Sequence, residues 1–165
     1  MNLQFYIEKL ESSDEFKKFK QEMPEAYMCS GFFVRDKEGG NDDVHIDFYD
    51  KKEDKIMSFQ LCNEIKGIPI EKKDEFSFEE ISMKLDFDFD EIEKMIDDKM
   101  EDMSIKNKVQ KILLSLQKVK GVDYLIGTIF ISSLGMVKIK IDLDKKEFLE
   151  FEKKSFLDMM KIIKK

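Results

Sequence analysis

Two segments of the chain repeat the same strand–turn–strand pattern, and this pattern constrains the fold more than any other feature of the sequence. Residues 46–59 read IDFYDKKEDKIMSF, and residues 141–151 read IDLDKKEFLEF. On both sides of each charged turn, apolar residues alternate with polar ones, which is typical of antiparallel strands joined by a hairpin. We therefore expect antiparallel hairpins in both halves of the chain.

The spacing of apolar residues predicts the other elements. Residues 1–23 have helical spacing, with a break at a capping box that begins at Ser12. Residues 26–36 and 123–132 are apolar on both faces, which is typical of central strands. Helical spacing is also found in residues 90–103, 105–116 and 153–165.

These elements predict an α+β fold with the order α-βββ-α-βββ-α. Antiparallel strands would form one or two sheets, and the helices would pack on one face. An offset of 97 residues aligns Tyr27 with Tyr124 and Phe33 with Phe130. We interpret this alignment as a degenerate internal α-β-β-β repeat.

The chain of 165 residues is expected to form a single domain. Its repeated halves would span residues 1–70 and 90–165, joined by the acidic segment 71–89. Charge is distributed unevenly, because the net charge is −5 over residues 1–70, −9 over residues 71–103 and +7 over residues 104–165. Such asymmetry indicates either a basic surface for an anionic partner or acidic and basic segments that face each other, within the monomer or across a dimer.

The basic C-terminal third contains the candidate anion-contact residues. Residues 104–121 have no arginine and no aromatic residue, so they lack the groups that usually recognise bases. Lysines alone can hold a phosphate backbone through charge. The candidates are Lys106, Lys108, Lys111, Lys118 and Lys120.

The sequence contains no motif for catalysis, a metal or a cofactor. Asp86, Asp88 and Asp90 have the spacing of the first ligands of a calcium loop, but Glu91 stands where that loop needs glycine. His45 is the only histidine, and no nucleophile motif accompanies it. We therefore expect no catalytic residue, no metal and no cofactor, and an enzyme acting through His45 and a carboxylate is the least favoured alternative.

Other features indicate the compartment. The sequence has no apolar run of about 18 residues and no signal-peptide pattern at its start, so we expect a cytoplasmic protein without membrane contact. Cys29 and Cys62 lie in predicted strands, where we expect them to be reduced and to pack as small apolar residues.

The stretch FKKFKQEMPEAYMCSGFFV, residues 16–34, resembles the opening of small uncharacterised proteins from archaea with reduced, AT-rich genomes, and this resemblance implies no activity. The predicted order of elements is similar to that of type III secretion chaperones and their YbjN-like relatives, which are dimeric protein binders. It is equally compatible with a PepSY-like arrangement, which also binds and does not catalyse. Since no residue motif carries the last two similarities, they are analogies of fold alone.

The leading functional hypothesis is a non-enzymatic intracellular protein-interaction module, chaperone-like or adaptor-like. Its partner would be another protein or a second copy of the chain. The hypothesis rests on two central apolar strands and three amphipathic helices in a chain without a catalytic motif. The alternative is binding of RNA or a ribosomal site by the lysine-rich C-terminal third.

Overall fold

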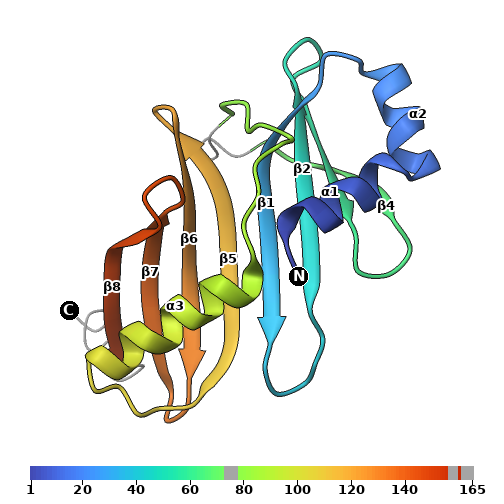
Figure 1. The fold of residues 1–165 in the computed structure, drawn as a ribbon. Coiled ribbons are helices and arrows are strands. Elements are labelled where there is room, and N and C mark those ends of the chain that lie inside the picture. The colour runs from blue at the N-terminus through green and yellow to red at the C-terminus, as the bar shows by residue number, and fades with distance from the viewer. Residues whose placement is uncertain (73–77, 156–159, 161–165) are drawn as a thin grey trace.

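The computed structural model of the chain describes residues 1–72, 78–155 and 160. Within these residues, eight strands form one antiparallel sheet that is accompanied by three helices (Figure 1). The elements are α1 (Leu3–Glu11), α2 (Asp14–Glu22), β1 (Tyr27–Asp36), β2 (Asp43–Asp50), β3 (Lys55–Gln60), β4 (Lys66–Ile70), α3 (Phe89–Asp102), β5 (Val109–Val119), β6 (Val122–Ile131), β7 (Gly135–Asp142) and β8 (Glu147–Ser155). The prediction of an α+β fold with an antiparallel sheet is confirmed.

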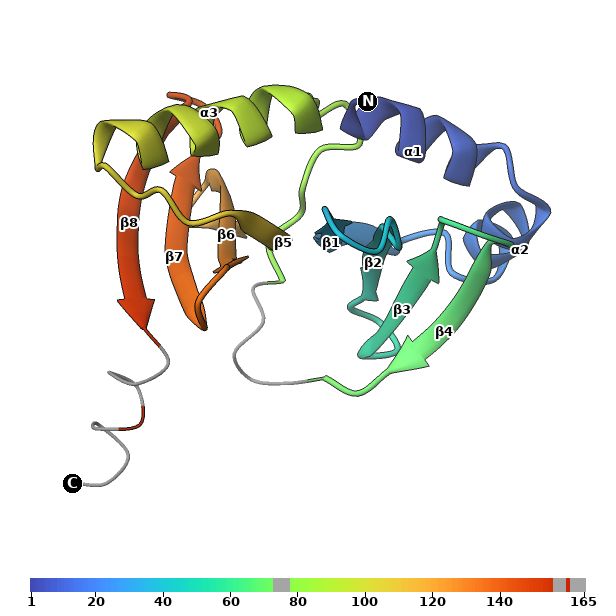
Figure 2. The same ribbon diagram turned by 90° about the horizontal axis from the view of Figure 1, so that it is seen from below.

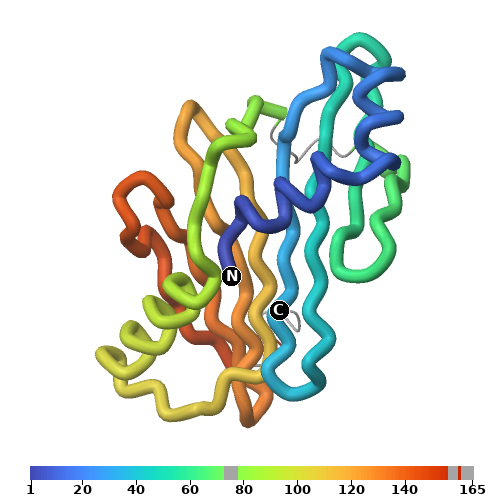
Figure 3. The backbone as a smooth tube through the Cα atoms, turned by 45° about the vertical axis from the view of Figure 1, so that its right-hand side comes forward, coloured from blue at the N-terminus to red at the C-terminus, as the bar shows by residue number. Residues whose placement is uncertain are grey.

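The strands follow the order β4-β3-β2-β1-β5-β6-β7-β8 across the sheet. Each half of the chain thus forms a four-stranded meander, and the first strands of the two meanders pair with each other. β1 and β5 run side by side at the centre of the sheet (Figure 3), where Gly31 pairs with Leu116 and Arg35 with Ile112. The two strand units therefore belong to one continuous sheet.

The helical N-terminus has the break that the sequence predicts. Asn2 caps α1, and Ser13, not the predicted Ser12, caps α2 by accepting a hydrogen bond from the backbone N–H of Phe16. A side chain at this position satisfies an N–H that has no partner within the helix, so a new helix starts here. Phe16 and Phe19 then point from α2 into the core of the molecule.

The segment predicted as a helix over residues 105–116 is instead largely strand β5. Buried Ile112, Leu114 and Leu116 alternate with the half-buried Leu113 and Ser115, which is the period of a strand. Apolar residues at these positions also satisfy helical spacing, so the pattern alone was ambiguous. Pairing with β1 on one side and β6 on the other decides the outcome, because it satisfies the backbone groups on both edges of β5.

The predicted order of three strands in each half is also wrong. β4 forms where the sequence indicated a linker, and β5 forms where it indicated a helix. Each half therefore has four strands. The internal repeat at an offset of 97 is not confirmed, because that offset superimposes β1 on β6 and not on β5. The predicted C-terminal helix lies outside the described residues, except for Met160 and for residues 153–155, which belong to β8.

The two similar turns join different strands of their meanders, β2 to β3 and β7 to β8. What they share is turn geometry. Asp50 and Asp142 each accept a hydrogen bond from the backbone two residues later. Four residues after each aspartate, Asp54 and Lys146 have φ values of 51° and 53°. The two hairpins therefore have the same kind of loop, although the repeated DKK letters lie two residues apart in it, since Asp142 and not Asp144 is the counterpart of Asp50.

The helices lie on one side of the sheet, and Figure 2 shows α1 and α3 along that side. Ring contacts connect the two layers. The ring of Phe16 on α2 lies 5.0 Å from that of Phe48 on β2, and the ring of Phe89 on α3 lies 5.0 Å from that of Phe33 on β1. Side chains that alternate with Phe33 and Phe48 along these strands point to the opposite side of the sheet.

We call this opposite side the open face. Its positions follow from the strand register and from the alternation of buried core residues along each strand. They include Ser30, Phe32 and Val34 on β1, Asp43, His45, Asp47 and Tyr49 on β2, Ser58 and Gln60 on β3, Leu113, Ser115 and Gln117 on β5, Tyr124, Ile126 and Thr128 on β6, Lys138 and Lys140 on β7, and Glu150 and Glu152 on β8.

Candidate functional site

The five lysines proposed as anion contacts do not lie together. Lys106 and Lys108 precede β5, and Lys111 lies near its start, whereas Lys118 and Lys120 lie at its far end. The 11 residues of β5 separate the two ends, by roughly 30 Å at about 3.3 Å per residue. A single phosphate-binding patch therefore cannot contain all five, and their role in anion binding stays a prediction.

The lysines at the far end of β5 also have local structural roles. Lys118 lies 3.9 Å from Asp123, and Lys120 is in the β5–β6 hairpin with a φ of 49°. The side chain of Glu79 accepts hydrogen bonds from the backbone N–H groups of Lys120 and Gly121. A carboxylate at this turn lowers the local positive charge.

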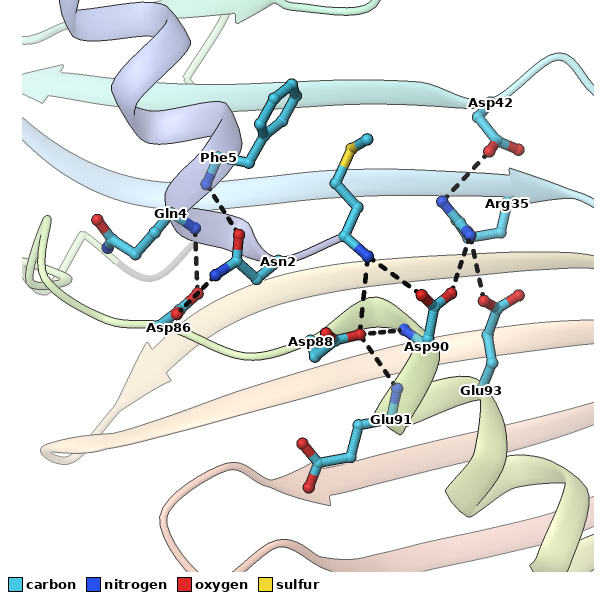
Figure 4. A network of polar contacts seen from close by, with 11 residues as sticks. Asn2, Gln4, Phe5, Arg35, Asp42, Asp86, Asp88, Asp90, Glu91 and Glu93 are labelled. Carbon is cyan, nitrogen blue, oxygen red and sulfur yellow. Dashed lines mark hydrogen bonds and ion pairs between the residues drawn. The ribbon is translucent and has the colours of Figure 1, made fainter.

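The aspartates with the spacing of a calcium loop belong to a different arrangement at the start of α3 (Figure 4). Asp86 accepts hydrogen bonds from the Asn2 side chain and from the backbone of Gln4. Asp88 caps α3 by accepting from the backbone N–H groups of Asp90 and Glu91. Because these carboxylates hold the N-termini of α1 and α3 together, their spacing has a structural explanation. Among the described residues, no group of three His, Cys, Asp or Glu side chains is arranged to hold a metal ion.

His45 belongs to a row of polar side chains on the open face. Its Nε2 lies 2.8 Å from Asp43 Oδ2, and its Nδ1 lies 3.5 Å from Ser58 Oγ. These residue types are those of a hydrolytic triad, but Ser58 is only 7% exposed and lies in the middle of β3. A nucleophile must reach a substrate atom. We therefore interpret the row as a polar network within the sheet.

Asp47 is the most buried charged group of this network. Its Oδ2 accepts a hydrogen bond of 2.7 Å from Ser30 Oγ, and its Oδ1 has no hydrogen-bond partner among the described residues. Burial raises the pKa of the Asp47 carboxyl, while the nearby hydroxyls of Ser58 and Ser30 and the charge of His45 act in the opposite direction.

One end of the open face is covered by Phe78, which lies in the chain ahead of α3. The ring of Phe78 lies 4.5 Å from that of Tyr49, and the hydroxyl of Tyr27 donates a hydrogen bond to the Phe78 carbonyl. Cys29 lies in the same cluster, where burial raises the pKa of its thiol to about 12. Cys29 and Cys62 are both free thiols. The thiolate is the reactive form, so Cys29 is a packing residue.

The centre of the open face is apolar. Phe32, in the central strand β1, is 40% exposed, whereas its neighbour Phe33 is fully buried on the helix side. A hollow of about 250 Å³ lies beside it and is lined by residues that include Phe32, Leu113, Ile126 and Thr128. The sequence does not reveal this site, because residues 105–116 also satisfy helical spacing and residues 26–36 are apolar on both faces, which is typical of a covered strand.

Charged groups flank this apolar centre. Asp43 and Asp47 lie on β2 to one side, and Lys138 and Lys140 lie on β7 to the other. Lys140 Nζ lies 4.4 Å from the centre of the Tyr124 ring, and Lys138 Nζ lies 3.5 Å from Thr128 Oγ1. Neither lysine forms an ion pair within the described part of the chain.

No protein-family model and no curated protein sequence matches the chain. A solved structure that resembles it is that of a putative lipoprotein from Clostridium difficile 630, with 16% sequence identity and a TM-score of 0.49. The similarity covers 86% of this chain and 91% of that protein. At this level of similarity it carries no argument about function. No characterised family is identified.

In the part of the chain that the structure describes, no helix is long and apolar enough to cross a membrane.

Proposed function

We propose that the chain is a non-enzymatic protein-interaction module that binds a protein chain through the open face of its sheet. The observation that carries this proposal is the exposure of Phe32 beside the hollow formed by Leu113, Ile126 and Thr128. An aromatic side chain in a central strand contributes little to stability when it is exposed to water. It contributes much more when a partner covers it.

The layout of the face supports the same function. Protein interfaces commonly have an apolar centre with aromatic anchors, surrounded by polar and charged groups. Here Phe32, Leu113 and Ile126 form the centre, and the charged residues lie on β2 and β7. A partner surface of matching chemistry would offer apolar side chains to the hollow and charges of opposite sign on each side.

The anion-binding alternative has weaker support. Its five lysines lie at two ends of β5, and the carboxylate of Glu79 lies at one of these ends. Lys106 and Lys108 could still contact a phosphate group as a pair, so the alternative remains a prediction with fewer contacts than the sequence indicated.

The test is affinity capture from a lysate of the source organism with three purified chains. These are the wild type, Phe32→Ser and, as a matched control, Leu134→Ser, which removes an apolar side chain that is 75% exposed in the β6–β7 hairpin. We expect the wild type and the control to recover the same protein in stoichiometric amount, either a partner or the untagged chain itself, and Phe32→Ser to lose it.

Equal recovery by all three chains, or no stoichiometric protein with any of them, would contradict the proposal. Recovery of nucleic acid that is lost at moderate salt would favour the lysine-rich segment, because phosphate contacts release counterions and weaken as salt rises.

A further inference from the structure

We propose that the protein chain bound by the open face is a second copy of this chain, in a two-fold symmetric dimer. This inference rests on the proposed function and names the partner. It comes from the positions of the exposed Asp43 and Lys138 and of the apolar centre between them, which are complementary under a two-fold rotation. In a two-fold dimer the same patch faces itself, so each feature must find its complement elsewhere on that patch.

The strand order provides the symmetry. The sequence β2-β1-β5-β6-β7 places β5 midway between the acidic strand β2 and the basic strand β7. A two-fold axis that runs parallel to β5, between two facing sheets, places β2 of one copy over β7 of the other. The same rotation places β1 over β6. Sheets that pack face to face keep their strands within about 30° of each other, so this correspondence survives their twist.

The strand register then defines which side chains meet. One row across the sheet runs Asp43, Val34, Leu113, Thr128 and Lys138. Asp43 and Lys138 are therefore equally far from Leu113, on opposite sides of it. Rotation about the axis brings Asp43 of each copy to Lys138 of the other, with Leu113 beside the axis.

The neighbouring row brings apolar side chains together. It runs His45, Phe32, Ser115, Ile126 and Lys140. The rotation places Phe32 of each copy over Ile126 of the other, so the exposed ring is covered by an apolar side chain. Lys140 is placed over His45, which adds no pair of opposite charge. The next row places Asp47 over Asp142, and both of these carboxylates are buried within their own copy.

The charges are available for these contacts. Lys138 and Lys140 form no ion pair within the described residues, and Asp43 contacts His45 and Gln60 while its side chain remains 32% exposed. Opposite charges across an interface set its register and reject wrong pairings, and like charges at one contact weaken association strongly. Each contact occurs twice in the dimer, so one substitution changes two of them.

Sedimentation velocity over a concentration series of the full chain tests the proposal. We expect the wild type to dimerise, and Asp43→Lys and Lys138→Asp each to raise the dimer dissociation constant by about tenfold or more, because each creates two like-charge contacts. Lys94→Asp, on the exposed side of α3, is the matched control and should dimerise like the wild type.

An equimolar mixture of Asp43→Lys and Lys138→Asp should form a heterodimer. One of its two contacts joins the substituted lysine of the first variant to the substituted aspartate of the second. The other contact joins the native Lys138 of the first variant to the native Asp43 of the second. Both contacts are therefore of opposite sign, and mixing should restore association that neither variant shows alone.

A monomeric wild type, or variants that fail to recover association when mixed, would overturn the inference. Circular dichroism establishes that each variant is folded. A photo-cross-linking residue in place of Phe32 identifies the occupant directly. Cross-links to an isotope-labelled second copy support the proposal, whereas cross-links to residues 156–165 of the same chain or to a different protein exclude it. In the last case, Phe32-dependent capture would still support the proposed function.

Discussion

Arg35 on the central strand β1 donates a hydrogen bond of 3.2 Å from Nη2 to Oε2 of Glu93 on α3. The guanidinium also lies 3.3 Å from Asp42, and its carbon is 5.9 Å from the centre of the Phe89 ring. Glu93 is only 8% exposed. The single arginine of the chain therefore connects the helix of the second half to the first strand of the first half (Figure 4).

Replacing Arg35 should destabilise the fold. Arg35→Met keeps the apolar stem but leaves the buried Glu93 with the Lys37 ammonium as its remaining charged partner. We expect a loss of about 2–3 kcal/mol in the free energy of unfolding, below the usual cost of breaking a buried pair because Lys37 remains. Urea unfolding measures it. Lys94→Ala, which removes the exposed pair with Asp98, is the control and should cause no measurable change. Equal stability of both variants would show that Arg35 does not hold α3.

Alanine substitutions of the neighbouring Phe32 and Phe33 on β1 should differ in their cost to stability, because the two rings point to opposite sides of the sheet. Phe33 is fully buried against Phe87 and Phe89, whereas Phe32 lies on the open face. Phe33→Ala should cost about 3–5 kcal/mol of unfolding free energy, as cavities in cores do. Phe32→Ala should cost less than about 1 kcal/mol in the isolated chain. Thermal unfolding at low concentration compares the two, and equal costs would be inconsistent with an open face.

Gly127 on β6 should not tolerate a side chain. A Cβ at this position would lie 2.3 Å from the backbone oxygen of Leu113 on β5, and a backbone atom within a paired strand has little freedom to move. Gly127→Ala should therefore destabilise the chain by about 2–3 kcal/mol. Gly121→Asn is the comparison and should cost less, because Gly121 has open space around it and asparagine adopts a positive φ such as its 81° more readily than most residues. Chemical denaturation of the two variants tests the contrast.

The buried carboxyl of Asp47 should make stability depend on pH. Its pKa in the folded state is raised above the unfolded value of 3.8, so the folded chain binds the proton more tightly than the unfolded chain. Stability therefore falls as pH rises from about 3.8 through the folded-state pKa. Asp47→Asn lacks this dependence, so its stability relative to the wild type should increase between pH 4 and pH 7.

Asp54 should give stability the opposite dependence on pH. Hydrogen bonds from Tyr49 and Lys72 lower the pKa of its carboxyl, so the stability it contributes is present above the unfolded value and lost as pH falls. Asp54→Asn should therefore weaken the fold at pH 7 more than at pH 3. Urea midpoints of the three proteins over a pH series measure both effects, and parallel curves for Asp47→Asn and the wild type would contradict the burial of Asp47.

The sequence predicted the hairpins and the N-terminal helices because their signals are local. Asp50 and Asp142 mark tight turns, and the pair Ser12-Ser13 marks a helix start, although the cap is Ser13 and not the predicted Ser12. The prediction of a helix over residues 105–116 was wrong because Ile112 and Leu116 satisfy both a helical and a strand period. The decision depends on pairing with β1, some 80 residues earlier, and no local pattern contains that information.

The candidate site was less predictable than the fold. Phe32 and Phe33 are adjacent residues of one apolar run, and nothing in the run indicates which of them is covered. That depends on where α1 and α3 pack. The lysines were identified by charge alone, which locates them along the chain but not in space. Because residues 109–119 form strand β5, these lysines are divided between its two ends.

The junction of β1 and β5 has a consequence for the order of folding. Within each meander, every strand pairs with its neighbour in the chain, so both meanders can form from short-range contacts. β1–β5 is the long-range pairing of the described sheet, and closing such a loop is slow compared with forming hairpins. During synthesis, β1 leaves the ribosome well before β5. Until β5 arrives, β1 remains an unpaired edge rich in aromatic residues and is the segment most exposed to intermolecular pairing.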